Sequence, residues 1–253
     1  HYKLFNPSLG DFLLHRYASN LADLESVFKC LRNLSAVGVL LNMSKNQLID
    51  REATLKILNT LFEYEESTEF RNSNSEYVAC LFLEINTRTS PYTNKHRLEQ
   101  AGSVILTNRA PMHYLCCLGV LLECISKGLI PPRESEEFAM EAIKIGASDE
   151  EMPLLGKLIT LLEGDEVHTL SDELAEVAQY NLLHSLTEYF DESDVFRYGY
   201  DLESSQHCLE DLIVDKFSSW NITPTEAMID DIIDAYDVKD RIQDFLASQE
   251  QQY

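Results

Sequence analysis

The sequence predicts an all-α fold, an irregular array of α-hairpins, on three observations. Apolar residues recur at helical spacing along most of the chain, and Ser, Thr, Asn and Asp stand where helices would begin. Gly128, Gly146 and Gly164 follow three expected helix ends at intervals of 18 residues. Two helices in about 36 residues is the size of an α-hairpin repeat unit. The side chains match no strict repeat consensus, so we expect the array to be irregular.

Capping residues predict the helices of the first half. Asn6 precedes Pro7 as an N-cap precedes proline at the first helical position. Asn20 is expected to cap a helix that runs to Arg32, and Asp50 to cap the helix that follows residues 34–43. The apolar residues expected to face inward are Leu21, Leu24, Phe28 and Leu31 in the former helix, and Leu55, Leu58, Leu61 and Phe62 in the latter.

Two more helices are expected over residues 74–88 and 93–108. The apolar run 76–86 suits a strand as well as a helix, because a short run does not distinguish the two.

The helices of the second half are predicted from capping boxes and glycines. Ser148 and Glu151 have the spacing of a capping box, as do Thr223 and Glu226, with Pro224 at the first helical position. Ser171 is expected to cap a long helix that reaches Phe190, ahead of an acidic turn. The expected ranges are 111–127, 133–145, 148–163, 171–190, 203–219, a helix from 224, and 238–248.

The expected domain organisation follows from composition. No segment rich in Gly, Ser or Pro divides the chain, so we expect one helical-array domain over residues 20–253. Residues 1–19 are expected to be the end of a preceding module and a junction helix. A chain of 253 residues that is 45% hydrophobic can bury a substantial core.

Two further features of the composition bear on location. No apolar run approaches the roughly 18 residues that a membrane span needs, so no membrane partner is expected. The six cysteines lie among apolar residues without the spacing of a disulfide framework, which indicates reduced thiols and a cytoplasmic protein.

The negative charge is concentrated in the second half of the chain. Residues 1–126 hold 12 Lys and Arg against 13 Asp and Glu, whereas residues 127–253 hold 8 against 30, and the net charge of the whole chain is −23. A field of this sign repels nucleic acid and anionic lipid and attracts basic partners. The alternative is that the carboxylates are solvated helix faces that serve only solubility.

Asp230, Asp234, Asp237 and Asp244 are expected to share one helical face, and they form the first candidate partner-binding site. A basic protein could dock on this stripe, or the stripe could be a solvated surface. The segment lacks the glycine and the terminal glutamate of an EF-hand loop.

A second candidate contact is aromatic and comprises Phe196, Tyr198 and Tyr200, which with Phe190 cluster around the acidic turn. The alternative is that these rings close the core beneath a loop.

No catalytic or cofactor site is predicted. No glycine-rich loop precedes a Lys-Ser or Lys-Thr pair, and there is no Gly-x-Ser-x-Gly segment. His113, Cys116, Cys117 and Cys124 share one expected helix and carry soft-metal ligand types. Their neighbours are apolar, so we expect core thiols and no metal.

The opening segment carries a resemblance to a known family. Phe5-Asn6-Pro7-Ser8-Leu9-Gly10-Asp11-Phe12-Leu13 resembles the segment that ends the NTPase module of bacterial STAND proteins, the signal-transduction ATPases with numerous domains. In that family a helical C-terminal region follows and senses a trigger, often in antiviral defence. The resemblance implies a non-catalytic recognition or regulatory domain that binds a protein trigger or holds its parent inactive. The alternative is a free-standing acidic scaffold that docks a basic protein.

Overall fold

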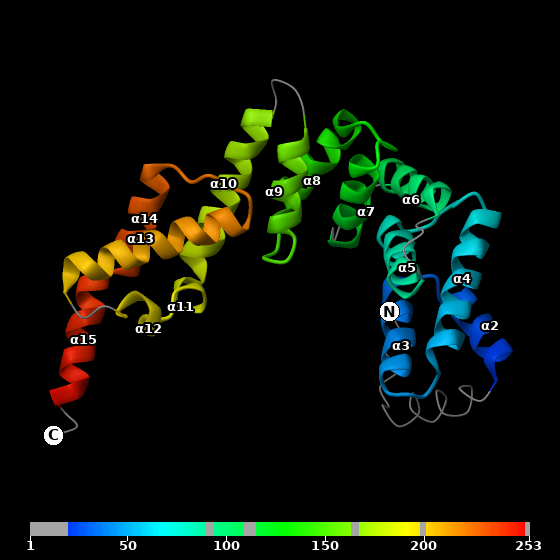
Figure 1. Ribbon diagram of the computed structural model, residues 1–253, viewed down its shortest axis with the longest axis horizontal. Helices are drawn as coiled ribbons and strands as arrows, with labels where there is room; N and C mark the ends of the chain where they lie inside the picture. The colour runs from blue at the N-terminus through cyan, green and yellow to red at the C-terminus, as the bar shows by residue number, and fades with distance from the viewer. Residues whose placement is uncertain (1–19, 90–93, 109–114, 163–166, 198–200, 251–253) are drawn as a thin grey trace. The chain divides into compact units, whose positions relative to one another are not determined.

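The computed structural model describes residues 20–89, 94–108, 115–162, 167–197 and 201–250. All regular structure in these ranges is helical, which confirms the predicted all-α array of hairpins (Figure 1). The helices gather into two compact units, residues 1–134 and 135–253. The single domain expected over 20–253 therefore contains two packed units, and no Gly-rich or Pro-rich stretch marks their boundary.

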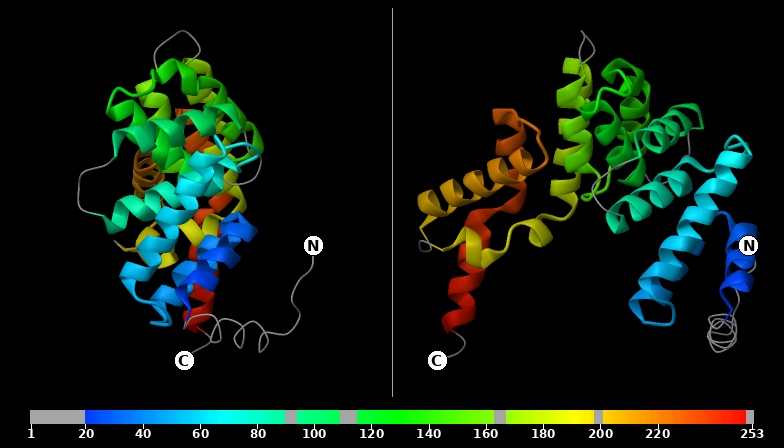
Figure 2. Two further views of the ribbon diagram at one scale, coloured as in Figure 1. Left: turned by 90° about the vertical axis from the view of Figure 1, so that its right-hand side faces the viewer. Right: turned by 45° about the vertical axis from the view of Figure 1, so that its right-hand side comes forward.

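Unit 1 is built from consecutive helices that pack on one another. α4 packs on α5, α5 on α6 and α6 on α7, while α5 also contacts α3 and α7 and α2 packs on α4 (Figure 2). The elements are α2 (Leu21–Leu31), α3 (Leu34–Lys45), α4 (Arg51–Ser67), α5 (Ser75–Arg88), α6 (Lys95–Thr107) and α7 (Leu115–Ser126), followed by the short 3₁₀ helix η1 (Pro132–Ser135) at the boundary.

The central position of α5 explains the ambiguous run at residues 76–86. α5 is surrounded by α3, α4, α6 and α7, so every residue from Ser75 to Phe82 is buried. A helix that is enclosed on all sides is apolar on all sides and loses the periodicity that marks an amphipathic helix. Asn74 caps it by accepting the N–H of Tyr77 at 3.0 Å.

Asn20 and Asp50 cap α2 and α4 as predicted. Each side chain accepts a backbone N–H in the first turn of its helix. Of the residues expected to face inward, Leu24, Phe28, Leu58, Leu61 and Phe62 are buried, Leu21 and Leu55 are half-buried, and Leu31 is exposed.

Unit 2 contains two helices of 18 residues, α10 and α13, together with shorter ones. α8, α9 and α10 pack together, α10 contacts α11 and α14, and α13 contacts α12, α14 and α15. The elements are α8 (Glu136–Ile145), α9 (Met152–Leu161), α10 (Val167–His184), α11 (Leu186–Tyr189), α12 (Glu192–Val195), α13 (Leu202–Ser219), α14 (Glu226–Tyr236) and α15 (Val238–Glu250).

The predicted ends of two middle helices are confirmed, since α7 ends shortly before Gly128 and α8 ends at Ile145, directly before Gly146. Gly128 and Gly146 have φ of 66° and 93°, a region that glycine enters without the steric cost of a Cβ. The predicted capping box forms only in part: the Ser148 N–H donates to Oε2 of Glu151 at 2.8 Å, but the Ser148 hydroxyl donates to the same carboxylate, and α9 begins later, at Met152. Gly164 lies outside the described residues, and α9 ends before it, at Leu161.

Two predicted helix boundaries in unit 2 are wrong. Ser171 lies inside α10, which is already helical at Val167, and α10 ends at His184 because Ser185 leaves the helical conformation with φ −141° and ψ 37°. The N-cap of α14 is Thr225 and not Thr223, since the Thr225 hydroxyl accepts the N–H of Met228 at 3.3 Å. Pro224 therefore precedes the cap.

A close backbone approach fixes the end of α13 against α9. A Cβ added to Gly156 of α9 would lie 2.0 Å from the carbonyl oxygen of Trp220. The neighbouring Asn221 side chain donates to the Pro153 carbonyl at 3.2 Å. Glycine is therefore required at position 156 for packing, since α9 has no other way to come this close to the 220–221 turn.

We expect Gly156→Ala to destabilise unit 2 by about 1–3 kcal/mol or more, because the clash is with backbone that cannot rotate away. Gly38→Ala in α3 is the matched control. A Cβ there meets nothing within 4 Å, so the helix should gain up to about 1 kcal/mol from the better helix former. Urea unfolding measures both, and equal stability of the two variants would contradict the close approach.

A buried ion pair joins three segments of unit 1. Arg32, which ends α2 with a left-handed φ of 37°, donates from Nε and Nη2 to the two carboxylate oxygens of Glu65 at 2.8 and 2.6 Å. The Ser73 hydroxyl donates to the same carboxylate. The Glu65 side chain is fully buried, whereas that of Arg32 is 29% exposed. The hydrogen bond with Glu65 raises the pKa of Arg32, so the guanidinium stays charged.

We expect Arg32→Met to cost about 3–5 kcal/mol of unfolding free energy, because it leaves the Glu65 carboxylate buried without its partner. Adding Glu65→Gln should recover part of that loss, since a neutral amide is cheaper to bury. The control is Arg71→Met, whose ion pair with Glu69 is 77% and 76% exposed and should matter by less than about 0.5 kcal/mol. Equal losses for Arg32→Met and Arg71→Met in urea unfolding would refute the buried pair.

Candidate functional site

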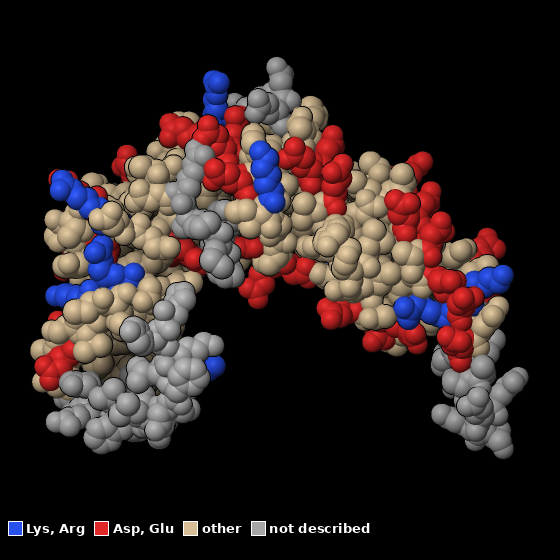
Figure 3. Space-filling view, turned by 180° about the vertical axis from the view of Figure 1, so that it is seen from behind, with Lys and Arg blue, Asp and Glu red and all other residues tan. Residues whose placement is uncertain are grey.

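The charge of the chain divides between the two units. Unit 1 holds 14 Lys and Arg against 14 Asp and Glu, and unit 2 holds 6 against 29. The whole net charge of −23 therefore belongs to unit 2. Figure 3 shows acidic side chains spread over the helices of unit 2, with few basic ones among them on the face drawn.

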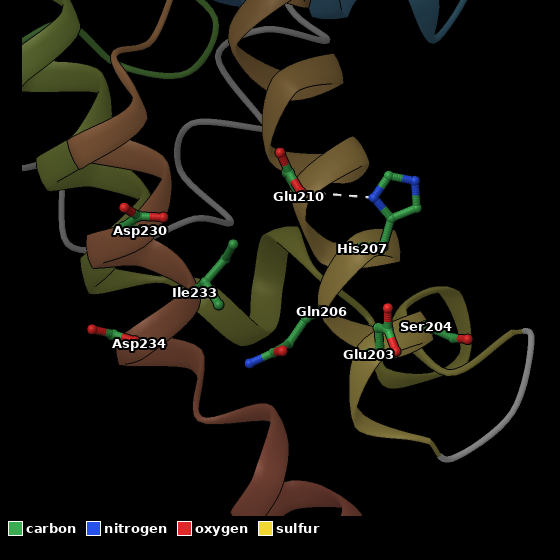
Figure 4. A pocket seen from close by; sticks show the side chains of 8 residues that line it. All are labelled: Glu203, Ser204, Gln206, His207, Glu210, Asp230, Ile233 and Asp234. Atoms are coloured by element: carbon green, nitrogen blue, oxygen red, sulfur yellow. Dashed lines mark ion pairs between the residues drawn. The ribbon is translucent and has the colours of Figure 1, made fainter.

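An acidic groove lies between α13 and α14. It has a volume of about 820 Å³. α13 buries one face, which includes Cys208, Leu209, Ile213 and Phe217, so the opposite face remains free to line the groove. The lining residues are Glu203, Ser204, Gln206, His207 and Glu210 of α13, and Asp230, Ile233 and Asp234 of α14 (Figure 4).

The groove brings carboxylates of two helices together, and no Lys or Arg lines it. Four of its eight lining residues are Asp or Glu, and none is Lys or Arg. His207 Nδ1 lies 3.7 Å from Oε2 of Glu210 and forms an ion pair with it when the imidazole is protonated (Figure 4). Ile233 is the apolar residue of the lining and extends into the space between the two helices, where Gln206 reaches toward it (Figure 4).

The prediction that Asp230, Asp234, Asp237 and Asp244 share one helical face is wrong, because the four residues do not lie on one helix. α14 ends at Tyr236, and Asp237 takes a left-handed conformation with φ 52° before α15 begins at Val238. This break changes the helix axis, so Asp244 is no longer in phase with Asp230 and Asp234. The Asp237 carboxylate accepts the N–H of Asp240 at 3.2 Å, which gives it a structural role at the start of α15.

The other two predicted aspartates line a different hollow. Asp237 and Asp244 lie with Glu192 and Asp240 around a space of about 530 Å³ that Arg241 also lines. Arg241 donates to the Tyr236 carbonyl at 2.8 Å and to the Glu192 carboxylate at 3.0 Å, and its guanidinium lies 4.3 Å from the Tyr236 ring centroid. The guanidinium of Arg241 therefore already offsets part of the negative charge in this second hollow.

The aromatic candidates divide between the core and the undescribed part of the chain. Phe196 is 6% exposed and Phe190 is 2% exposed. Phe190 packs edge-on against Tyr236, and its carbonyl accepts the Tyr236 hydroxyl at 3.3 Å. Phe196 is therefore a core ring and not a surface contact, as the alternative interpretation held. Tyr198 and Tyr200 lie outside the described residues.

The cysteine-rich helix is part of the core, as predicted. Cys117 and Cys124 of α7 are buried, and the Cys124 thiol donates to the Leu98 carbonyl at 3.3 Å. Burial raises the pKa of each of these thiols to about 12. His113 lies outside the described residues. Within the residues that are described, no three His, Cys, Asp or Glu side chains gather as a metal site would need.

The α13 side of the groove was missed by the sequence analysis. Glu203, Gln206, His207 and Glu210 recur at intervals of three and four residues, which identifies one polar helical face. That pattern cannot show that this face lies opposite Asp230 and Asp234, because the pairing depends on how the turn at 220–225 folds α14 back on α13.

Comparisons with known proteins add no assignment. No family model matches the chain, and neither a curated protein nor a solved structure matches it. The segment that resembles STAND proteins, residues 5–13, lies outside the described residues. Over the described ranges, no helix combines the length and the apolar character that crossing a membrane requires.

Proposed function

We propose that the chain is a protein-recognition module whose acidic groove binds a basic segment of a partner protein. The observation that carries this proposal is that Glu203 and Glu210 of α13 and Asp230 and Asp234 of α14 line one space that contains no Lys or Arg. The second hollow is the weaker candidate, because Arg241 already lies among its carboxylates.

The chemistry of the groove suits lysine or arginine side chains. Their charged ends would meet carboxylates from either helix, and their aliphatic stems would lie along Ile233. The net charge of unit 2 would add long-range attraction and speed the encounter with a basic partner. The same field disfavours nucleic acid and anionic lipid, whose phosphates carry negative charge.

The test uses a fluorescein-labelled peptide that alternates lysine with alanine, titrated with the full chain at low ionic strength and followed by fluorescence anisotropy. The groove variant carries Glu203→Gln, Asp230→Asn and Asp234→Asn. We expect it to bind about tenfold more weakly or worse, a loss of about 1.4 kcal/mol, because these carboxylates contact the lysines directly.

The matched control carries Asp172→Asn, Asp240→Asn and Asp244→Asn, which removes the same charge from unit 2 but leaves the groove intact. It should retain most of the affinity, and circular dichroism should show both variants folded. Equal weakening by the two variants would mean that the peptide responds to net charge alone, and it would refute the groove as the docking site.

We further propose, on the resemblance of residues 5–13, that this module belongs to a larger bacterial STAND-type NTPase. In that setting the partner is a trigger protein in the cytoplasm, and its binding to the module relieves inhibition of the parent in antiviral defence. The support is the nine-residue segment alone. A phosphate-binding loop encoded within several hundred residues upstream of His1 is the expected finding, and its absence from the gene leaves the free-standing acidic scaffold as the better description.

A further inference from the structure

Two thiols meet at the packing interface of α5 and α7 in unit 1. Cys80 lies in the middle of α5, Cys116 lies on α7, and the two helices pack directly on each other. The side chains of Cys80 and Cys116 are hydrogen-bonded to one another. Cys80 is buried and Cys116 is partly exposed, so solvent reaches one thiol of the pair.

None of the other four cysteines is described in a side-chain hydrogen bond with a second cysteine. Cys117 and Cys124 are buried, where the Cys117 thiol interacts with Ser75 and the Cys124 thiol donates to the Leu98 carbonyl. Cys208 is buried in unit 2, and Cys30 is exposed on α2. Cys80 and Cys116 are therefore the pair that the fold brings together across two helices.

The surroundings of the pair make its two thiols unequal. The hydrogen bond from Cys80 lowers the pKa of Cys116, because it stabilises the Cys116 thiolate, and the same bond together with burial raises the pKa of Cys80. Glu76 and Glu84 lie close enough for their negative charge to oppose ionisation of both thiols. Cys116 is thus both the more exposed thiol and the one that ionises first.

We propose that Cys80 and Cys116 are a redox modification site at which hydrogen peroxide forms a reversible disulfide between α5 and α7. Cys116 is the attacking residue because a thiolate with access to solvent reacts with peroxide. Cys80 is the resolving residue because it is the thiol in contact with Cys116.

The reaction proceeds in two balanced steps. The Cys116 thiolate attacks one peroxide oxygen, an S–O bond forms, the O–O bond breaks, and the departing hydroxide takes up a proton to become water. The sulfur of Cys80 then attacks the sulfur of the Cys116 sulfenic acid. The S–S bond forms, the S–O bond breaks, and the leaving hydroxide takes the Cys80 proton and departs as water. The two thiols lose two electrons and two protons, and peroxide is reduced to two waters.

The cross-link would close a loop that contains α6. Since α6 packs on both α5 and α7, the loop is closed around contacts that exist in the reduced protein. We therefore expect oxidation to raise the thermal midpoint of unit 1, since a cross-link limits the freedom of the unfolded chain. A thiol reductant should reverse the shift.

The experiment treats the reduced full chain with hydrogen peroxide, blocks the remaining thiols with iodoacetamide, and maps tryptic peptides by mass spectrometry without reduction. The expected product joins the peptide of residues 72–88 to that of residues 110–127. It should persist in Cys117→Ala and Cys124→Ala and disappear in Cys116→Ser. In Cys80→Ser, dimedone should label Cys116, because the sulfenic acid has lost its resolving thiol.

Several results would overturn the proposal. These are a cross-link that depends on Cys117, a disulfide between Cys116 and Cys117, or oxidation of Cys30 while Cys80 stays fully alkylated. Cys30→Ser serves as the control for a solvent-exposed thiol and should leave the cross-link unchanged. Circular dichroism checks that each variant is folded, and the Cys117→Ala result decides the question even if Cys116→Ser fails to fold.

Discussion

The burial of Tyr236 at the end of α14 holds the C-terminal helices of unit 2 in place, and the acidic groove depends on it. The ring is fully buried, its hydroxyl bonds to the Phe190 carbonyl, and the guanidinium of Arg241 covers its face. The next residue, Asp237, must then take a left-handed conformation for the chain to turn into α15. This anchored turn keeps Asp230 and Asp234 beside α13 and directs Asp244 elsewhere.

The helices of unit 2 that line the groove keep their buried apolar side chains and their carboxylates on different faces. Apolar faces of α13 and α14 supply the core, while the carboxylates of these two helices remain exposed. In unit 1, by contrast, the Glu65 carboxylate is fully buried and depends on the bidentate hydrogen bonds of Arg32. A buried carboxylate without such a partner is costly, and Glu151, the buried acid among the described residues of unit 2, accepts two hydrogen bonds from Ser148.

Local signals in the sequence predicted the fold well where one residue determines the outcome. Asn20 and Asp50 cap their helices, and Gly128 and Gly146 adopt the positive φ expected of them. The failures arise where tertiary packing decides. Ser171 has the side chain of an N-cap but lies within α10. Asp237 follows the helical spacing of its neighbours, yet the burial of Tyr236 ends α14 just before it. Half of the predicted acidic site, Asp230 and Asp234, thus lines the groove, and its other wall required the structure.

The central claim is that a basic partner binds between α13 and α14. Nuclear magnetic resonance of the full chain, titrated with the lysine–alanine peptide, tests it most directly because it locates the contact by residue. We expect backbone amide shifts to change over residues 203–210 and 230–234, with smaller changes along α15. Shifts spread evenly over the acidic helices of unit 2, or centred on residues 237–244, would contradict the claim.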